Sequence, residues 1–420
     1  MRRDDTIHFC PPPRVIIGEG SRKQLPALLH ELGYRNGLLV TDTFFSEQTP
    51  WVSEYLEAAA ELGIQTVVND EGIPDPTTTL CDEVTEHVLE QNAGKPLDHV
   101  IALGGGSNID LAKALCLTLR HKRPIKEFIG DEHDKSDCLP LIALPTTAGT
   151  GSEATPGTIL VDPDNATKVA VMHNQLRPVV ALIDPEFTYT CPPKVTAEAG
   201  LDALTHALES YLTLDSKDFD RGGAVDPGYS GRSLLTMMFA HESVRLCAKY
   251  LQRAYHNGSD EEARSGMAYA SHYAALSYGS AGLNAIHGIA YAVAGLTGKS
   301  HGATNAVVMP YVLDALVPHR TTEMAELARL FGINESDEFK AAKQLPGLIR
   351  NLVEELGIAG NFVDFGIPPE QQSTLLRDAL EVTRLAKALP VPDVESAYER
   401  IIDNGFNNVL DHEAEQVMVS

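Results

Sequence analysis

HVIALGGGSNIDLAKA, residues 99–114, has the pattern of a short apolar strand, a glycine-rich turn and the start of a helix. Glycines let backbone N–H groups approach a phosphate, and a helix N-terminus adds unpaired donors and a positive dipole. The GGGS spacing matches neither GxGxxG nor GxxxxGK[ST]. Strand-to-helix turns also carry glycine for tight geometry. From this stretch alone, phosphate binding and a purely structural turn are about equally supported.

The same alternation of strand and helix patterns continues on both sides of this stretch. Apolar runs rich in Val, Ile and Leu occupy residues 14–18, 36–42, 66–70, 99–106, 141–147 and 179–185, with amphipathic segments such as 21–33 and 81–94 between them. This alternation predicts a mostly parallel sheet covered by helices. Beyond about residue 187 long helical patterns follow, at 195–213, 231–256 and 261–279, with a loop at 214–231. We therefore expect an α/β domain over residues 1–187 and an all-helical domain over 188–420.

The overall charge excludes several classes of function. The 420 residues include 33 Lys and Arg against 58 Asp and Glu, a formal net charge of −25. Such a chain repels phosphate backbones and anionic lipid, so we expect neither nucleic acid nor a membrane as a partner. The six cysteines form no CxxC, and no run approaches the roughly 20 apolar residues of a membrane span. A secretory signal peptide has an apolar stretch after its first basic residues, and no such stretch follows Arg2 and Arg3. The chain is therefore predicted to be cytoplasmic.

Two other strand ends carry polar residues suited to a nucleotide. ALPTTAGTGSEAT (143–155) is a cluster of hydroxyl and glycine residues that can wrap a ligand, although such loops are common in any protein. Asp42 ends the run LLVTD (38–42), where a carboxylate accepts the ribose hydroxyls of NAD and repels the 2′-phosphate of NADP. Taken singly, an Asp at this position is more often a turn residue or a helix cap.

The helical half contains a set of residues that can hold a metal. In GLDALTHALESY (200–211), Asp202 and His206 are four residues apart and share one helix face. His287 and His301 follow in NAIHGIAYAVAGLTGKSHGATNA (284–306). Three neutral imidazoles and one carboxylate suit Fe²⁺ or Zn²⁺ and leave a net positive ion that can act as a Lewis acid. The spacing equally fits an ordinary surface pair or a core hydrogen bond.

Taken together, these motifs resemble those of the iron-containing (group III) alcohol dehydrogenases. The resemblance rests on GGGSNIDLAKA, PTTAGTGSEAT, AGLDALTHALESY and GLNAIHGIAYAVAGLTGKSHGATNAVVMPYV, with PPPRVIIGEGS (11–21) and EGIPDPT (71–77) in support. Order and spacing agree over roughly residues 8–315. The resemblance implies a nucleotide-binding α/β domain, a helical metal-binding domain, and a cleft between them for NAD(P) and a divalent ion. This architecture is shared with dehydroquinate synthase.

The family's functional residues carry over onto matching positions. The resemblance implies Asp202, His206, His287 and His301 as ligands of Fe²⁺, with Zn²⁺ as the alternative. It places the pyrophosphate on Gly104, Gly105, Gly106 and Ser107, with Asp110 and Lys113 on the following helix. Thr146, Thr147, Thr150 and Ser152 would line the nucleotide, with Lys168 nearby, and Asp42 falls where members that prefer NAD carry an acid. Members of the family are commonly homodimers or larger homo-oligomers.

This chain departs from the family pattern at three places. Asn108 stands where proline usually follows GGGS, Tyr291 stands where many members have histidine, and the 214–231 loop is longer than usual. Tyr291 lies one helical turn after His287, so both are assigned to the catalytic pocket, Tyr291 as a pocket-shaping residue or a donor to substrate. A packing role for Tyr291 is about equally supported. A phenol with a pKa near 10 relays protons poorly at neutral pH.

The predicted activity is that of an NAD-dependent alcohol dehydrogenase or aldehyde reductase acting on a small alcohol or aldehyde. Hydride would pass between the substrate carbon and the nicotinamide while the ion polarises the substrate oxygen. Plain short-chain substrates are the default. An anionic tail is the second possibility, held by Lys299 near His301, with His272 on the preceding helix and with Lys217, Arg221 and Arg232 in or beside the long loop. Alternatives are a glycerol dehydrogenase-like polyol oxidoreductase, a dehydroquinate synthase-like lyase and an inactive binding protein; the last would be expected to lack ligands.

Overall fold

The computed structural model describes residues 6–93, 95–130, 134–165 and 167–412. Contacts divide the chain into two compact units, one over Cys10–Thr190 and one from Cys191 onward that also takes in the N-terminal residues up to Phe9. The division therefore falls at 190/191, where the sequence analysis places it at 187/188. Residues 6–9 join the helical unit because the Thr6 carbonyl accepts a hydrogen bond from Arg221 (2.9 Å) and Phe9 stacks on Phe239.

A six-stranded sheet forms the centre of the first unit. All its pairings are parallel, in the order β1-β8-β5-β4-β2-β3. The strands are β1 (Arg14–Ile17), β2 (Asn36–Val40), β3 (Gln65–Asn69), β4 (His99–Gly104), β5 (Leu141–Pro145) and β8 (Val180–Ile183). Each overlaps one of the six predicted apolar runs, and only β3 extends beyond its run, by one residue, which confirms the parallel α/β fold.

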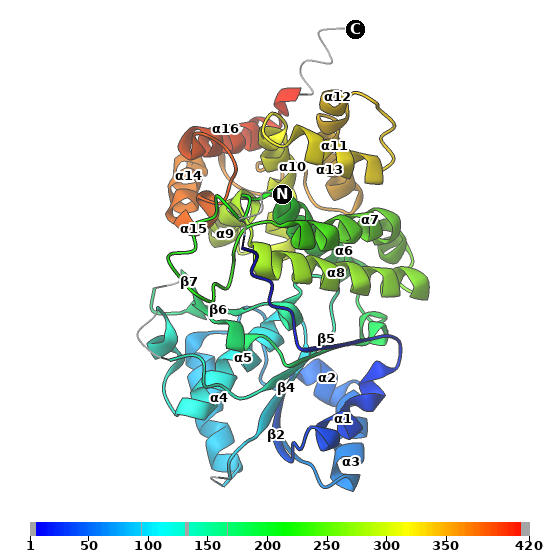
Figure 1. The fold of residues 1–420 in the computed structure, drawn as a ribbon, viewed down its shortest axis with the longest axis vertical. Coiled ribbons are helices and arrows are strands. Elements are labelled where there is room, and N and C mark those ends of the chain that lie inside the picture. The colour runs from blue at the N-terminus through cyan, green and yellow to red at the C-terminus, as the bar shows by residue number, and fades with distance from the viewer. Residues whose placement is uncertain (1–5, 94, 131–133, 166, 413–420) are drawn as a thin grey trace. The chain divides into compact units, whose positions relative to one another are not determined.

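Helices cover both faces of this sheet (Figure 1). The side chains of a strand alternate between the two helical layers. Leu38 and Val40 of β2 pack in one apolar core with α4 (Thr78–Gln91) and α5 (Gly106–His121). Leu39, the residue between them, packs in a second apolar core on the opposite face of the sheet, with α1 (Leu25–Glu31), α2 (Thr43–Glu47) and α3 (Trp51–Glu61). Because successive strand side chains point to opposite faces, strands buried on both sides are apolar throughout.

The structure adds one element that the sequence analysis does not predict. Strands β6 (Gly157–Asp162) and β7 (Thr167–Met172) form a separate antiparallel hairpin. The DPDN stretch at 162–165 between them has the residue types of a tight turn, so a turn signal was present in the sequence. The hairpin packs on α4 and α5 rather than joining the main sheet.

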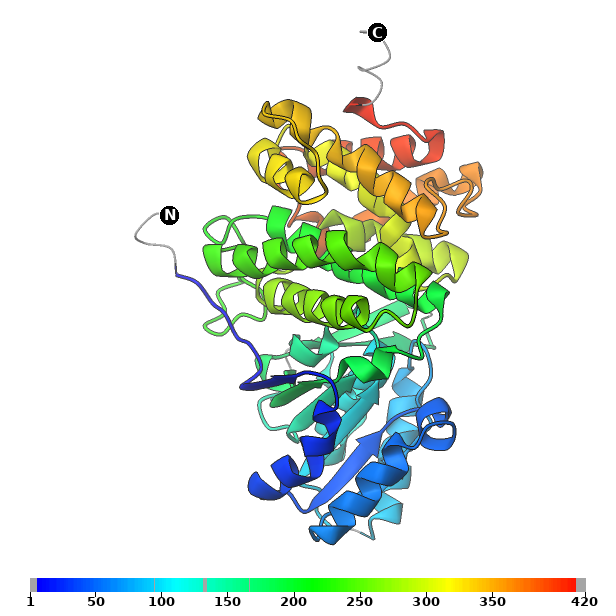
Figure 2. The same cartoon turned by 90° about the vertical axis from the view of Figure 1, so that its right-hand side faces the viewer.

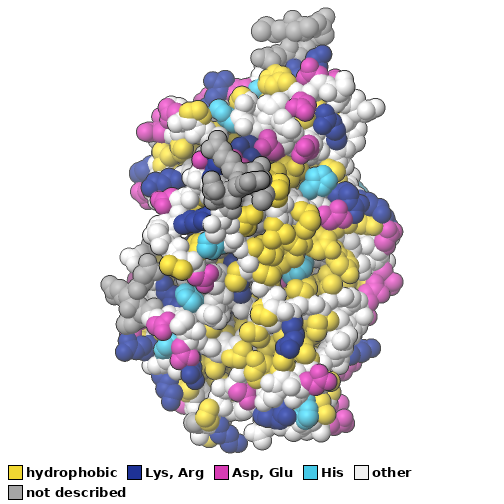
Figure 3. Space-filling model, viewed as in Figure 1, with side chains coloured by type: hydrophobic (Ala, Val, Ile, Leu, Met, Phe, Trp, Pro, Cys, Tyr) yellow, Lys and Arg dark blue, Asp and Glu magenta, His cyan; other side chains and the backbone are white. Residues whose placement is uncertain are grey.

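The second unit is helical, as expected; its described residues contain no strand beyond an isolated bridge that joins Asp215, in the 214–231 loop, to Arg232 just after it. Helices α6, α7 and α8 pack along one another (Figures 1 and 2). The helices are α6 (Pro193–Leu212), α7 (Leu234–His256), α8 (Glu261–Ala281), α9 (Ala285–Thr297), α10 (His301–Leu316), α11 (Thr321–Leu330), α12 (Glu338–Ala342), α13 (Leu345–Glu355), α14 (Gln372–Glu381), α15 (Thr383–Ala386) and α16 (Val394–Asn407). Apolar side chains gather on the surface over α7 and α8 (Figure 3). Among the described residues, no helix is both long enough and apolar enough to cross a membrane.

Candidate functional site

Helix α6 carries the first two predicted metal ligands on its buried face. Asp202 and His206 are 2% and 4% exposed, and the His206 Nε2 atom lies 3.8 Å from Asp202 Oδ1. Helix α6 is buried over nearly all of its second half, so polar side chains there need partners. The i, i+4 spacing therefore places both side chains in the interior of the helical unit.

The two remaining predicted ligands come from the starts of α9 and α10. His287 lies in the first turn of α9 and is 1% exposed, whereas His301 is the first residue of α10 with a partly exposed side chain. One ligand atom from each of Asp202, His206, His287 and His301 lies within 4.8 Å of the other three. The structure thus brings together residues separated by up to 99 positions.

The donor set fits a divalent cation. The Nε2 atoms of His206 and His287 face each other at 3.1 Å, and His301 Nε2 lies 3.8 Å from Asp202 Oδ1. Lone pairs that converge in this way favour a shared positive charge at the centre. Bonds from Fe²⁺ or Zn²⁺ to imidazole and carboxylate are about 2.0–2.2 Å, so small inward movements would bring all four atoms onto one ion.

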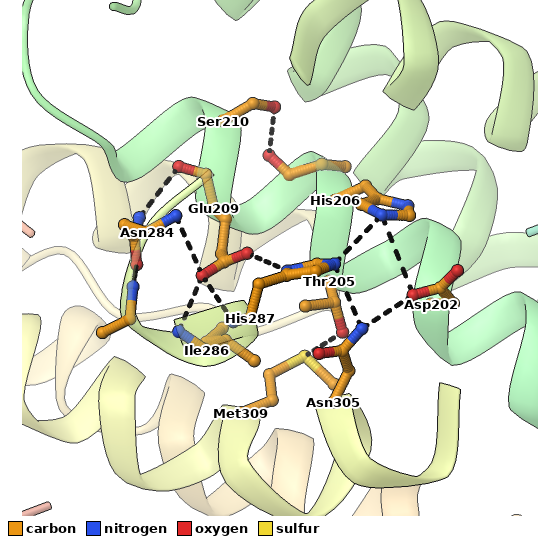
Figure 4. Close-up of polar contacts among 12 residues, drawn as sticks. Asp202, Thr205, His206, Glu209, Ser210, Asn284, Ile286, His287, Asn305 and Met309 are labelled. Carbon is orange, nitrogen blue, oxygen red and sulfur yellow. Dashed lines mark hydrogen bonds and ion pairs between the residues drawn. The ribbon is translucent and has the colours of Figure 1, made fainter. Parts of the chain in front are cut away.

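Three buried residues around this cluster are absent from the predicted set (Figure 4 shows two of them). Asn305 of α10 donates from Nδ2 to Asp202 Oδ1 (2.8 Å), and the Tyr278 ring stacks on His206 at 4.1 Å between centroids. Glu209 Oε2 makes a hydrogen-bonding contact with His287 Nδ1. Glu209 follows Asp202 by seven residues and Asn305 follows His301 by four, so both share a helix face with a ligand. That spacing was a signal available in the sequence.

Tyr291 lies beside the cluster, as its position in α9 predicts. Its ring is stacked against His301 with centroids 5.7 Å apart and is edge-on to His287 at 6.3 Å. Burial raises the pKa of Tyr291 above its usual value of 10, and the positive charge of Arg384 opposes that rise. The phenol is therefore protonated at neutral pH, where it can donate a hydrogen bond but cannot act as a base.

In the first unit, the GGGS turn joins β4 to α5 with its helix N-terminus uncapped by any side chain. Gly104 has φ +154°, and a Cβ on Gly106 would lie 2.7 Å from Thr150. A Cβ on Gly105 would lie 3.6 Å from Thr147, and the backbone N–H of Thr146 donates to the Gly104 carbonyl (3.0 Å). The 143–155 loop therefore packs directly on the glycine-rich turn, bringing the two predicted nucleotide motifs together.

Asp110 and Lys113 of α5 have internal partners. Lys113 is fully buried and its Nζ donates to the Thr155 carbonyl, the Thr155 hydroxyl and the Gly157 carbonyl, at 2.8–3.0 Å. Asp110 accepts from Ser152 Oγ (3.2 Å) and from the Ile159 N–H (3.1 Å). Burial lowers the pKa of Lys113 to about 8 and raises that of Asp110. These two side chains hold the 152–159 segment against α5.

Asp42 follows β2 and caps the N-terminus of α2. Its Oδ1 accepts from the N–H groups of Phe44 and Phe45, while Asn108 Nδ2 donates to Oδ2 at 2.8 Å. The helix-cap alternative is therefore realised. The sheet order reverses between β2 and β4, so Asp42 and the GGGS turn flank the switch point where ligands of such sheets bind.

Lys168 is linked to the glycine-rich turn through Asp75. Its Nζ pairs with Asp75 Oδ1 at 2.7 Å, and the Asp75 N–H donates to Ser107 Oγ at 3.2 Å.

The cations suggested for an anionic tail are engaged with other groups. Lys299 Nζ donates to the Phe365 carbonyl and lies 3.9 Å from the centre of the Phe365 ring. Arg232 is 6% exposed and pairs with Asp215 (2.9 Å) and Glu323 (2.7 Å), and Arg221 binds the Thr6 carbonyl. The structure also places Lys217 beside Asp218 and buries His272 in α8.

Comparison with known proteins gives matches over nearly the whole chain. The family model for iron-containing alcohol dehydrogenase matches residues 12–185, and the model for its C-terminal domain matches residues 230–400. The chain is 30% identical over 376 residues to NAD-dependent methanol dehydrogenase of Bacillus methanolicus, covering 89% of this chain and 93% of that one.

Solved structures that share the fold include two that are named for an activity. A 1,3-propanediol oxidoreductase has a TM-score of 0.86 at 26% identity, with 96% of this chain and 100% of that chain covered. Sulfoacetaldehyde reductase from Bifidobacterium kashiwanohense, in complex with NAD⁺, has a TM-score of 0.81 at 25% identity, with 95% and 98% covered. The chain belongs to the iron-containing alcohol dehydrogenase family, and it is an oxidoreductase acting on CH–OH groups.

Proposed function

We propose that this protein is a metal- and NAD-dependent alcohol dehydrogenase or aldehyde reductase acting on a small alcohol or aldehyde. The observation that carries the proposal is the convergence of Asp202, His206, His287 and His301 within 4.8 Å. Fe²⁺ is our first choice and Zn²⁺ the alternative; the choice of iron rests on family membership, because both ions accept this ligand set.

The roles of the chain's own residues follow from this assignment. When bound, a divalent ion would supply Lewis acidity toward the substrate oxygen, and NAD would supply the hydride chemistry. Asp202 and the three histidines of the cluster would hold the ion within the helical unit. Tyr291, with its protonated phenol, donates to substrate or shapes the pocket. In the first unit, Gly104–Ser107 offer backbone donors to the pyrophosphate, with Thr146, Thr147, Thr150, Ser152 and Lys168 arranged around them.

The test of the metal assignment is His206→Ala, measured first by metal content. This variant should lose most of its bound ion and most of its NADH oxidation with aldehydes at 340 nm, while its circular dichroism stays that of the wild type. His256→Ala, an exposed histidine at the end of α7, is the matched control and should keep both. Wild-type metal content in His206→Ala would rule out the assignment. Comparing iron-loaded with zinc-loaded protein decides between the two ions.

For the substrate, we propose a small aldehyde or alcohol. Where the substrate carries an anionic tail, we propose that the tail binds Arg384 rather than Lys299. Arg384 is exposed on α15, its guanidinium carbon lies 5.2 Å from the centre of the Tyr229 ring, and its charge opposes the rise in the pKa of Tyr291. Lys299 would first have to leave its contacts with Phe365. Two similar proteins support both kinds of substrate. One is named for sulfoacetaldehyde, which carries a sulfonate, and the other is named for methanol, a plain alcohol.

The test compares kcat/KM for propanal and sulfoacetaldehyde in three proteins. Arg384→Ala should lower the value for sulfoacetaldehyde roughly 10- to 100-fold, the worth of one charge-assisted hydrogen bond, and leave propanal nearly unchanged. Lys299→Ala is the matched control and should affect neither selectively. Equal effects of Arg384→Ala on both substrates would exclude a tail-binding role.

A homodimeric or larger assembly and a cytoplasmic location stay predictions. Light scattering of purified protein measures the oligomeric state.

A further inference from the structure

Glu209 is a buried carboxylate that the proposed chemistry does not use. It lies on α6 three residues after His206, and it is 1% exposed. A buried carboxylate is costly unless its oxygens are hydrogen-bonded. Its two oxygens have separate sets of partners, as Figure 4 shows.

One oxygen organises the start of helix α9. Glu209 Oε1 accepts hydrogen bonds from the backbone N–H groups of Asn284 (3.2 Å), Ile286 (2.7 Å) and His287 (3.3 Å). The Asn284 side chain donates back to the Glu209 carbonyl at 3.3 Å. These contacts satisfy N–H groups that a helix start otherwise leaves without partners, and they join α6 to α9.

The other oxygen is directed at the ring of His287. Glu209 Oε2 forms a short contact with Nδ1, while Nε2 on the opposite side of the ring faces His206 Nε2 at 3.1 Å. A carboxylate oxygen only accepts, so Nδ1 must carry the proton. A neutral imidazole protonated at Nδ1 presents a lone pair at Nε2, which is the atom turned toward the predicted ligands.

We propose that Glu209 is a positioning residue that fixes His287 as its Nδ1–H tautomer and thereby prepares Nε2 to bind the ion. The inference rests on the proposed metal site and extends it beyond the four ligands. Carboxylate partners of ligating histidines orient the ring and raise its basicity, and their loss typically weakens metal binding 10- to 100-fold.

The division of work between the two oxygens allows the roles to be separated. Glu209→Gln can keep its amide oxygen on the three backbone N–H groups at the start of α9 and its N-cap, while placing an NH₂ group against His287 Nδ1. Two donors cannot bond to each other, so the ring is driven to the Nε2–H tautomer, whose proton occupies the metal-binding lone pair. Glu209→Ala would remove both roles at once and would not distinguish them.

The experiment measures Co²⁺ and Zn²⁺ affinity of the metal-free full-length protein by chelator competition, together with thermal unfolding without metal. Glu209→Gln should raise the dissociation constant 10- to 100-fold and weaken the visible Co²⁺ absorption, while its metal-free unfolding temperature changes little. Asp314→Asn is the matched control, because Asp314 is a buried carboxylate that accepts from the Asp411 N–H (2.7 Å) and contacts His412 Nδ1 (2.8 Å). That variant should bind metal like the wild type.

A second readout does not depend on the variant folding. In Zn²⁺-loaded wild-type protein labelled with ¹⁵N-histidine, the Nδ1 of His287 should show the chemical shift of a protonated nitrogen. Wild-type affinity in Glu209→Gln, or an unprotonated Nδ1 in the wild type, would overturn the inference and leave Glu209 as a helix cap. If the wild type itself binds no metal, the proposed function fails instead.

Discussion

At the scale of single residues, Asp42 has both a structural partner and a proposed ligand. Its carboxylate accepts from the N–H groups of Phe44 and Phe45 and from Asn108, and a carboxylate has about four acceptor sites, so capacity for one ribose hydroxyl remains. We expect Asp42→Gly to raise the ratio of NADPH to NADH use, because a negative charge that repels the 2′-phosphate is removed. Glycine is tolerated at helix N-caps at a cost of a few tenths of a kcal/mol, so the fold should survive.

The measurement for Asp42 is kcat/KM with each cofactor. Asn108→Ala is the control: it removes the 2.8 Å hydrogen bond but leaves the charge, so the preference for NADH should largely remain. A wild-type enzyme that already prefers NADPH would contradict the role assigned to Asp42.

Tyr291 is the second residue whose role the structure sharpens. Burial raises its pKa above 10, so its protonation state does not change between pH 6 and 9. We therefore expect Tyr291→Phe to leave the shape of the pH profile of kcat unaltered. If the hydroxyl donates to substrate, Tyr291→Phe should lower kcat/KM roughly tenfold, about one net hydrogen bond. Wild-type kinetics would assign Tyr291 to packing, and loss of an ionisation from the profile would contradict the pKa argument.

At the scale of elements, Lys113 joins helix α5 to the segment that leads into β6. Its three hydrogen bonds, to Thr155 and Gly157, satisfy a buried ammonium group, but desolvation still lowers its pKa from 10.5 to about 8. Below pH 8 both folded and unfolded states bind the proton, and folding bears the full cost of burying the charge. Between pH 8 and 10.5 the unfolded state binds more protons, so the contribution of Lys113 to stability rises with pH.

The variant Lys113→Met tests this linkage. The free energy of unfolding of the wild type relative to Lys113→Met should increase as pH rises from 8 to 10.5, by up to about 3 kcal/mol for the whole shift. Denaturant titrations of both proteins at several pH values give this difference, in which titrations common to both cancel. A difference that is flat or falls over this range would show that the lysine is not desolvated.

At the scale of the whole molecule, the net charge of −25 dominates the electrostatics. Acidic and basic side chains are interspersed on the face seen in Figure 3, so the excess acts there as general repulsion rather than as one patch. Salt shortens the screening length from about 10 Å at 0.1 M to about 3 Å at 1 M, which should relieve this repulsion more than it weakens exposed ion pairs. We expect the unfolding temperature to rise by a few degrees between 0.05 and 1 M NaCl at pH 8.

The control for the salt effect is pH. Near pH 5 the protein is close to its isoelectric point of about 4.9, so the same salt step should change the unfolding temperature much less. A lower unfolding temperature in NaCl at pH 8 would show that specific ion pairs outweigh the net charge.

Local pattern determined the elements of this protein. The six parallel strands and helices α6, α7 and α8 follow from runs and periodicities of 5 to 26 residues, because side-chain direction repeats every two residues in a strand and every 3.6 in a helix. The glycine-rich turn and the pair Asp202 and His206 are also local patterns. Their grouping with His287 and His301 rested on donor chemistry and then on resemblance, because nothing in local spacing joins residues about 80 to 100 positions apart.

Only the tertiary structure decided what surrounds those residues. Glu209 meets His287 across 78 positions and Asn305 meets Asp202 across 103, contacts that depend on how α6, α9 and α10 pack. Likewise, Lys299 has the sequence context of a free cation, but the fold directs its amine to Phe365. A side chain's available chemistry is set by which partners already satisfy its donors and acceptors. Buried polar groups need such partners, and for His287 and Asp202 they come from parts of the chain that are distant in sequence.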